Sequence, residues 1–393
     1  MLSLGGSRCR WNPSSATENL ETLQITNDSD CHGHDYWLTD FPKLRRLTWI
    51  PLTWRADLDA LAMGLGKFAH QLTLLELDIF EYERKSSGGY RPYYFKSKEE
   101  YERPNYFAWE IMALAVNQKT RVFDSLERLY LCGIPFKMAE LEMANAFNWS
   151  KLQSLHLRFC SGWAEFLHQI TRSGQKIDLK SLTLEPSPVL ELPGEEVDAI
   201  CSFLRAFTGL RSLFLSTNGA YGTLEIWGAV LSHKATLKTF VHNQRVPASF
   251  WSADWDGDDD FPPLDPPKLP FTAQELEMVQ DDPATNPLSQ LGLEFLGLSF
   301  PPNELTCLLL PFTKGHTTLR LLHIRQAGGY TDQYDSWGVD LHYFDYKSVH
   351  PRPSQDLVDF GNCGSSGPMA SLHLRAWRLE TLVMEIGNLG TVT

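Results

Sequence analysis

Two groups of residues in this sequence have the types needed for metal chemistry, and the first is a short cluster near the amino terminus. Cys31, His32, Gly33, His34 and Asp35 bring thiol, imidazole and carboxylate groups together. Tetrahedral zinc sites usually need two separated pairs of ligands, and this cluster has no second pair at a matching distance. We interpret it as a polar turn and expect it to hold no metal ion.

The second group is an acidic run that resembles a calcium loop in residue type alone. Asp254, Asp256, Asp258, Asp259 and Asp260 follow one another closely. A calcium loop that began at Asp254 would need Gly and Glu at its sixth and twelfth positions, where Asp259 and Asp265 stand. Several prolines follow, so a solvated loop is the better interpretation. Motifs for a serine nucleophile, a zinc protease or a phosphate-binding loop are also missing, and we expect neither a cofactor nor enzymatic activity.

A recurring leucine phrase indicates the elements that would position functional side chains. Each copy has an apolar residue at its first, fourth and sixth positions. Successive first positions at 126, 152, 179, 210 and 237 are close to the 20–29 residue period of leucine-rich repeats. Clear copies begin at Leu20, Leu72, Leu126, Leu152, Leu179, Leu210, Leu293 and Leu319, and weaker copies at Leu44, Leu237 and Leu379.

Each phrase reads as a short strand, and an amphipathic helix follows many of them. In a strand, alternate side chains face opposite sides, so the fourth and sixth positions point into the core and the third, fifth and seventh point outward. The helices are expected at 57–70, 138–147, 163–171, 195–207, 224–232 and 304–312.

The sequence therefore predicts an α/β fold, a leucine-rich-repeat solenoid with strand–helix repeats of about 27 residues, a parallel inner sheet and outer helices. We expect residues 1–18 to form an irregular segment and residues 19–393 to form the array. Irregular inserts are predicted at 81–104, 245–287 and 326–369.

Outward-facing positions of the strands supply the candidate binding residues. His156 and Arg158 hold the same positions in their phrase as His323 and Arg325 hold in another, and Tyr130 and Phe214 share the fifth position with Thr183. Aromatic residues of the third insert, Tyr334 and Trp337 among them, could contact a partner or could pack the insert against the repeats. Ordinary surface polarity is the alternative interpretation for the strand positions.

Composition limits the partners. The net charge of −13 and the pI near 5.4 disfavour nucleic acid. Uninterrupted apolar stretches of about 18 residues do not occur, so we expect no membrane span. The seven cysteines are an odd number and form no CxxC pair, which favours reduced thiols and a cytoplasmic or nuclear protein.

Several phrases resemble the repeat region of fungal F-box/leucine-rich-repeat proteins. They are FDSLERLYL at Phe123–Leu131, WSKLQSLHLRFC at Trp149–Cys160, FTGLRSLFL at Phe207–Leu215 and TLRLLHIR at Thr318–Arg325. In that family an amino-terminal F-box docks on a Skp-type adaptor of a ubiquitin ligase, and the repeats hold the target. No F-box pattern precedes Leu20, so the adaptor is an expected partner only if an F-box lies upstream.

We therefore expect a protein-binding leucine-rich-repeat module, the substrate-recognition part of an F-box-type ubiquitin ligase subunit, with an unknown protein target. One alternative is a structural scaffold without a link to a ligase. Another is an enzyme that uses an insert as a lid, but no nucleophile–base pair supports it.

Overall fold

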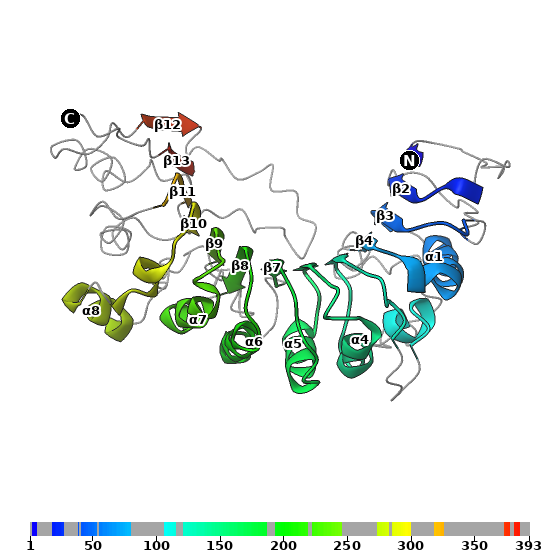
Figure 1. The fold of residues 1–393 in the computed structure, drawn as a ribbon, viewed down its shortest axis with the longest axis horizontal. Coiled ribbons are helices and arrows are strands. Elements are labelled where there is room, and N and C mark those ends of the chain that lie inside the picture. The colour runs from blue at the N-terminus through cyan, green and yellow to red at the C-terminus, as the bar shows by residue number, and fades with distance from the viewer. Residues whose placement is uncertain are drawn as a thin grey trace, which may run out of the picture. The chain divides into compact units, whose positions relative to one another are not determined.

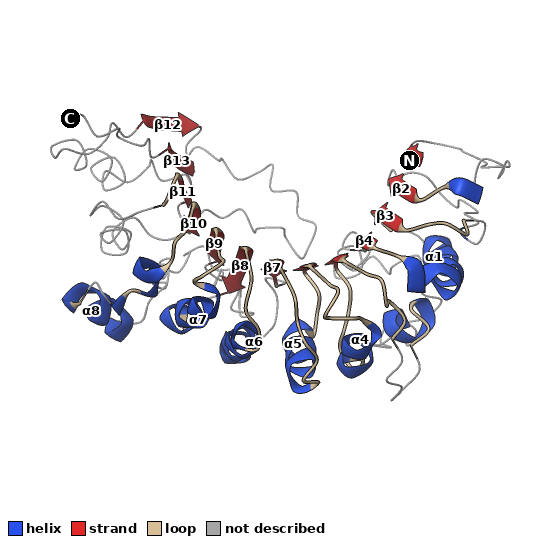
Figure 2. Cartoon of the chain, in the orientation of Figure 1, coloured by secondary structure: helices blue, strands red, loops and turns tan. Residues whose placement is uncertain are grey.

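A computed structural model gives the structure of the chain. It describes residues 2–5, 18–26, 38, 41–52, 55–79, 106–114, 121–186, 193–218, 222–245, 273–282, 285–299, 318–325, 373–377 and 381–385. The chain forms two compact units, the first mainly Met1–Ser187 and the second mainly Pro188–Arg205 and Gly209–Asp335 together with Val339–Thr393. In both units strands alternate with helices along the chain (Figures 1 and 2).

The first unit contains a parallel sheet in which every strand pairs with the strand that follows it in the chain. The strands are β1 (Leu2–Gly5), β2 (Thr22–Thr26), β3 (Arg46–Ile50), β4 (Leu74–Asp78), β5 (Arg128–Cys132), β6 (Ser154–Arg158) and β7 (Ser181–Glu185). The helical elements are α1 (Arg55–Phe68), η3 (Ala69–Gln71), η4 (Phe107–Ile111), α4 (Glu140–Ala146) and α5 (Trp163–Arg172).

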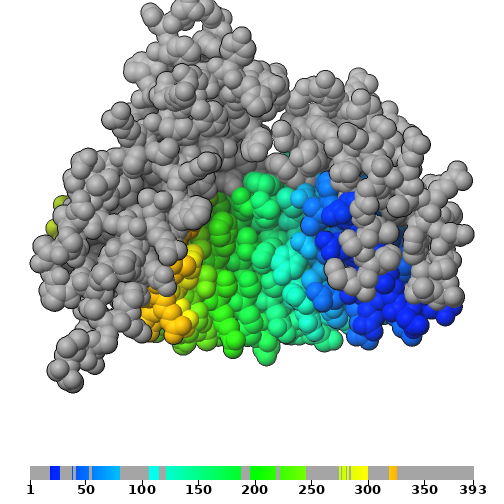
Figure 3. All heavy atoms as spheres, turned by 90° about the horizontal axis from the view of Figure 1, so that it is seen from above, coloured from blue at the N-terminus to red at the C-terminus, as the bar shows by residue number. Residues whose placement is uncertain are grey.

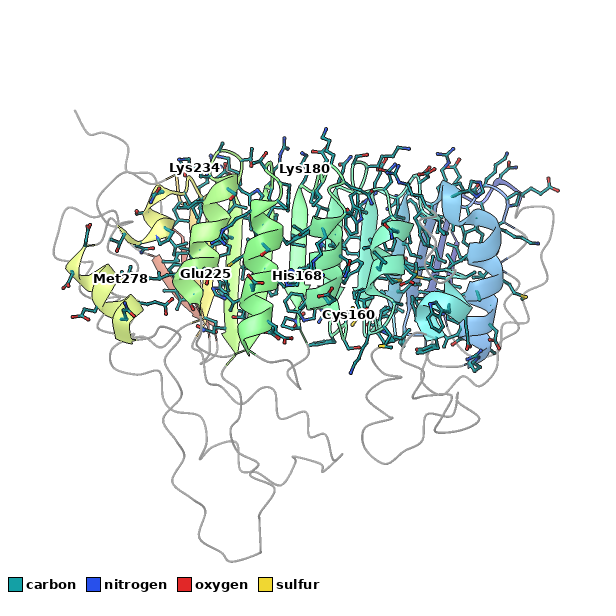
Figure 4. All side chains as sticks on the ribbon, turned by 90° about the horizontal axis from the view of Figure 1, so that it is seen from below. Cys160, His168, Lys180, Glu225, Lys234 and Met278 are labelled. Carbon is teal, nitrogen blue, oxygen red and sulfur yellow. The ribbon has the colours of Figure 1, made fainter. Side chains whose placement is uncertain are left out.

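The second unit begins with the same alternation. Strands β8 to β11 are parallel neighbours in chain order. The elements are α6 (Pro193–Arg205), β8 (Ser212–Asn218), α7 (Thr223–Val230), η5 (Leu231–His233), β9 (Thr239–Arg245), α8 (Ala273–Asp281), η7 (Pro287–Gln290), β10 (Phe295–Ser299), β11 (Leu321–Arg325), β12 (His373–Trp377) and β13 (Thr381–Glu385). Figure 4 shows the helices in front of the strands that they cover.

The leucine phrase explains the sheet of the first unit. The residues at its fourth position are aligned from strand to strand and are fully buried: Leu47, Leu75, Leu129, Leu155 and Leu182. Full burial of one leucine contributes about 1.5–3 kcal/mol, so this row supplies much of the energy that holds the strands in register. Since a shift by one residue would expose the whole row, the register is strongly specified.

Aromatic side chains fill the space between the sheet and the helices of the first unit. The ring centroids of Phe123 and Phe147 are 5.2 Å apart, and those of Phe147 and Trp149 are 5.9 Å apart. Phe166 of α5 lies 5.9 Å from Trp149 and 4.5 Å from Phe136 by the same measure. All five side chains are fully buried, so the tryptophans and phenylalanines of these repeats are core residues.

The predicted α/β repeat is confirmed for both units. Helices form at five of the six expected places, and the expected helix at 304–312 lies outside the described residues. The inserts at 81–104 and 326–369 also lie outside them. Within the expected insert at 245–287, the structure describes α8 and the start of η7.

The last leucine phrase differs from the expected pattern. Its residues Leu382 and Met384 belong to β13, which runs antiparallel to both β11 and β12. Only residues 378–380 separate β12 from β13, whereas a parallel connection needs a dozen residues or more. A hairpin is therefore the arrangement that this connection allows, and the phrase alone could not reveal the direction of the strand.

The amino-terminal segment also differs, since residues 1–18 were expected to be irregular. Leu2–Gly5 form β1, which pairs with β2 in parallel, with Leu2 opposite Leu23 and Leu4 opposite Ile25. Leucines at alternate positions suit a strand that extends the same sheet.

One weak copy of the phrase places a histidine where other repeats carry leucine. His242 of β9 is fully buried, opposite Leu215 of β8 and Leu298 of β10. The indole Nε1–H of Trp227 donates to its Nδ1 at 3.0 Å, so Nε2 carries the proton and faces Thr217 Oγ1 at 3.0 Å. A buried polar ring is tolerated at this position because both of its nitrogens are hydrogen-bonded.

Candidate functional site: the outward face of the first sheet

The outward face of the sheet in the first unit brings three of the predicted site residues together. Tyr130 on β5 lies opposite His156 on β6, which lies opposite Thr183 on β7. All three are half-buried, unlike the leucines on either side of them in the strands. Figure 3 shows the strand side of the molecule, where the atoms coloured from cyan to green are open to view.

Tyr130 and His156 form an aromatic pair at the centre of this face. Their ring centroids are 4.2 Å apart and the planes are inclined by 73°, an edge-to-face contact. Ser154 Oγ lies 3.5 Å from the hydroxyl oxygen of Tyr130. Two aromatic rings with polar atoms at their edges provide a surface that can exclude water and still form hydrogen bonds.

The imidazole of His156 is uncharged at neutral pH. Burial of the ring, and to a smaller extent the positive charge of Arg158, lowers its pKa to about 4. Within the described part of the chain, no hydrogen bond reaches its ring nitrogens. A neutral imidazole has one donor and one acceptor nitrogen, so His156 offers both to a partner.

Arg158 does not stand alone at the end of β6, because it forms an ion pair with Glu185. Its Nε lies 2.6 Å from a carboxylate oxygen of Glu185, whose side chain is 15% exposed against 50% for Arg158. The centre of the Arg158 guanidinium is 5.5 Å from the centroid of the Phe159 ring. The pair gives this edge of the face a fixed charge pattern, negative on β7 and positive on β6.

The neighbouring Cys132 corrects one expectation. As the seventh residue of its phrase it was expected to face solvent, but it is only 8% exposed. Burial raises the pKa of its thiol, and the adjacent carboxylate of Asp78 raises it further. The thiol is therefore protonated at neutral pH and is a weak nucleophile.

Cys160, at the ninth position of its phrase, has the structural role that the repeat pattern predicts. Its thiol lies 3.5 Å from the carbonyl oxygen of Leu131 and 3.4 Å from that of Arg158, so it can donate to backbone groups where β5 and β6 end. Burial raises the pKa of this thiol to about 12. Figure 4 shows Cys160 at one edge of the unit and Lys180, which precedes β7, at the opposite edge.

The remaining predicted residues belong to the second unit or lie outside the described residues. Phe214 and His323 are half-buried members of one outward row, which runs from Phe214 through Val241 and Gly297 to His323. Arg325 pairs through its backbone with Ser299. Tyr334 and Trp337 lie outside the described residues.

Sequence reasoning missed Asp78 and Glu185, the acidic residues of the face. Both stand at the same position as Arg158, one strand before and after the pair formed by β5 and β6. Their shared place in the phrase could have identified them once the register was known. The pairing of Arg158 with Glu185 depends on side-chain conformations, to which the leucine pattern is insensitive.

No metal site or membrane-spanning element occurs in the part of the chain that the structure describes. No group of three or more His, Cys, Asp or Glu side chains is placed there to hold a metal ion. None of the described helices has the length and apolar character needed to cross a bilayer. The cluster at 31–35 and the acidic run at 254–260 lie outside the described residues.

Comparison with known proteins identifies no relative. No protein-family model matches the chain, and no curated protein matches it significantly.

Proposed function

We propose that this chain is a protein-binding repeat module, and that the outward face of the first sheet holds the partner. One observation carries the proposal: the aromatic pair of Tyr130 and His156 lies next to the ion pair of Arg158 and Glu185 on a single face. Tyrosine and arginine are enriched among residues that dominate binding energies in protein interfaces.

The chemistry of the face supports binding rather than catalysis. The thiols of Cys132 and Cys160 have raised pKa values because they are buried, and His156 contacts no described nucleophile. A catalytic constellation would need a nucleophile and a base within hydrogen-bonding distance. A rigid sheet with half-buried aromatic side chains is instead well suited to recognition, because little conformational entropy is lost when a partner binds.

Site-specific photocrosslinking tests the proposal. A photoreactive amino acid replaces His156 on the strand face or, as the control, His168 on α5, which Figure 4 shows on the helix side. Incubation with extract of the source cells should give protein crosslinks from position 156 and few from position 168. The alternative of a structural scaffold predicts no such preference for the strand face.

Affinity measurements then test the aromatic pair. Once a crosslinked partner is identified, Tyr130→Ala should weaken its binding by about tenfold or more, because a central aromatic residue often contributes above 1.4 kcal/mol. His168→Ala should bind as the wild type does. Equal affinities for the two variants would contradict the proposal.

The narrower proposal of a role in a ubiquitin ligase is supported by the resemblance of the repeat phrases alone. Its test is co-purification of a Skp-type adaptor with the native protein from its source. A crosslinked partner whose stability does not change when the gene is deleted would argue against this role.

A further inference from the structure

Two arginines on the outward face of the first sheet lie in one row. Arg46 on β3 is opposite Leu74 on β4, and Leu74 is opposite Arg128 on β5. Arg46 is exposed, Arg128 is half-buried, and Leu74 between them is 7% exposed. We name Arg46, Leu74 and Arg128 the arginine row.

The guanidinium groups of this row are unused. Other arginines of the unit form ion pairs, such as Arg158 with Glu185 and Arg55 with Asp59. For Arg46 and Arg128, by contrast, the described part of the chain contains neither an ion pair nor a side-chain hydrogen bond. A partly buried guanidinium is costly to leave without an acceptor, so Arg128 in particular would gain from an external anion.

The neighbours of the row define where an anion could lie. Glu76 is two residues beyond Leu74 on β4, and its carboxylate accepts a hydrogen bond from Thr48 Oγ1 at 3.0 Å. This negative charge disfavours a second anion over the middle of the face. An acidic ligand is therefore confined to the arginine row, at the end of the strands where Arg46 and Arg128 stand.

We propose that the arginine row binds an extended acidic segment of the protein partner. Two acidic side chains of the segment would pair with Arg46 and Arg128, and an apolar group between them would cover Leu74. This inference rests on the proposed function and adds the chemistry of the partner to it.

The spacing of the arginines sets the spacing of the acidic residues. Arg46 and Arg128 are two strands apart, which corresponds to about 9.6 Å across a sheet. In a polyproline II conformation, residues three positions apart point to the same side and are separated by about 9.3 Å. Acidic residues at positions i and i+3 of an extended segment therefore match the row.

The charge of the chain favours a short acidic segment over a polyanion. The net charge of −13 repels a long phosphate backbone, whose attraction depends on many simultaneous contacts. Two guanidiniums nevertheless bind two carboxylates at close range, where Coulomb interactions are screened least.

Selection from a display library of random 12-residue peptides tests the inference on the full-length chain. Enriched peptides should carry pairs of Asp or Glu three positions apart. A synthetic peptide of this kind should bind Arg46→Gln or Arg128→Gln about tenfold more weakly, and the double variant more weakly still. Arg211→Gln removes an exposed arginine of the second unit and should leave the affinity unchanged.

Other results would overturn the inference. Peptides without acidic pairs, whose binding is lost in Tyr130→Ala and retained in the double arginine variant, would refute the arginine row but uphold a protein-binding face. Acidic peptides that bind the double variant as tightly as the wild type would also refute it. A single-stranded oligonucleotide that binds more tightly than the peptides and needs both arginines would assign the row to nucleic acid. Enrichment of no peptide, together with no crosslink from position 156, would overturn the proposed function as well.

Discussion

The buried histidine of β9 makes the stability of the second unit depend on pH. His242 has both ring nitrogens engaged, by Trp227 and by Thr217, and burial lowers its pKa to about 4 from an ordinary value of 6.5. The unfolded chain therefore binds more protons than the folded chain between these two pH values. The free energy of unfolding is unaffected by this group above pH 6.5 and decreases as the pH falls from 6.5 towards 4.

The size of the effect follows from the two pKa values. At pH 5, a histidine with a pKa of 6.5 in the unfolded chain and about 4 in the folded chain lowers the unfolding free energy by about 2 kcal/mol relative to pH 7. The variant His242→Leu restores the residue type that other repeats carry. It removes the titrating group but leaves the Trp227 indole N–H without its acceptor, which costs about 1–3 kcal/mol at any pH.

The expected result is a change in how stability depends on pH. The variant should be less stable than the wild type at pH 7, and this difference should shrink by about 2 kcal/mol at pH 5. Urea denaturation at both pH values, followed by fluorescence and circular dichroism, measures it if the two transitions coincide. His70→Leu, which replaces an exposed imidazole in the first unit, is the control. Equal pH dependence in all three proteins would refute the reasoning.

Three further predictions concern the first unit. Leu155→Ala should cost about 2–5 kcal/mol because it opens a cavity in the leucine row, whereas His156→Ala should cost less than 1 kcal/mol; equal shifts of the melting temperature would contradict the assignment of the two faces. Gly162→Ala should destabilise more than Gly174→Ala. Both glycines have positive φ, but a Cβ at position 162 would lie 2.9 Å from a backbone nitrogen, whereas nothing lies within 4 Å at position 174. Glu185→Gln should cost no more than about 1 kcal/mol, and its effect should decrease in 1 M salt, because its ion pair is partly exposed.

The leucine phrase predicts the repeated elements well because it records burial directly. Every fourth-position leucine from Leu75 to Leu182 lies in register in the core, and the helices that follow use the same apolar logic. The neighbouring positions of Tyr130 and His156 also follow from the phrase, since equal positions in parallel neighbours face each other. The period, the strand direction within the array and the outward face were thus available from the sequence.

What the phrase could not supply depends on side-chain geometry or on short connections. Cys132 is buried although its position faces outward, because it contacts Asp78 at the end of the strand. The ion pair of Arg158 and Glu185 joins residues 27 positions apart and requires a particular conformation of each. The antiparallel direction of β13 is set by the short connection from β12, which the leucine spacing does not encode.

Stacking of successive repeats has a consequence for how this surface can evolve. Tyr130, His156 and Thr183 are neighbours in space, yet each belongs to a different repeat. A change within one repeat therefore alters one column of the face and leaves the adjacent columns untouched. Because the buried leucines recur at the same positions in each repeat, exchange of a whole repeat by recombination would preserve the core while introducing three new outward side chains. Such a protein can acquire a new partner one column at a time, without an intermediate that fails to fold.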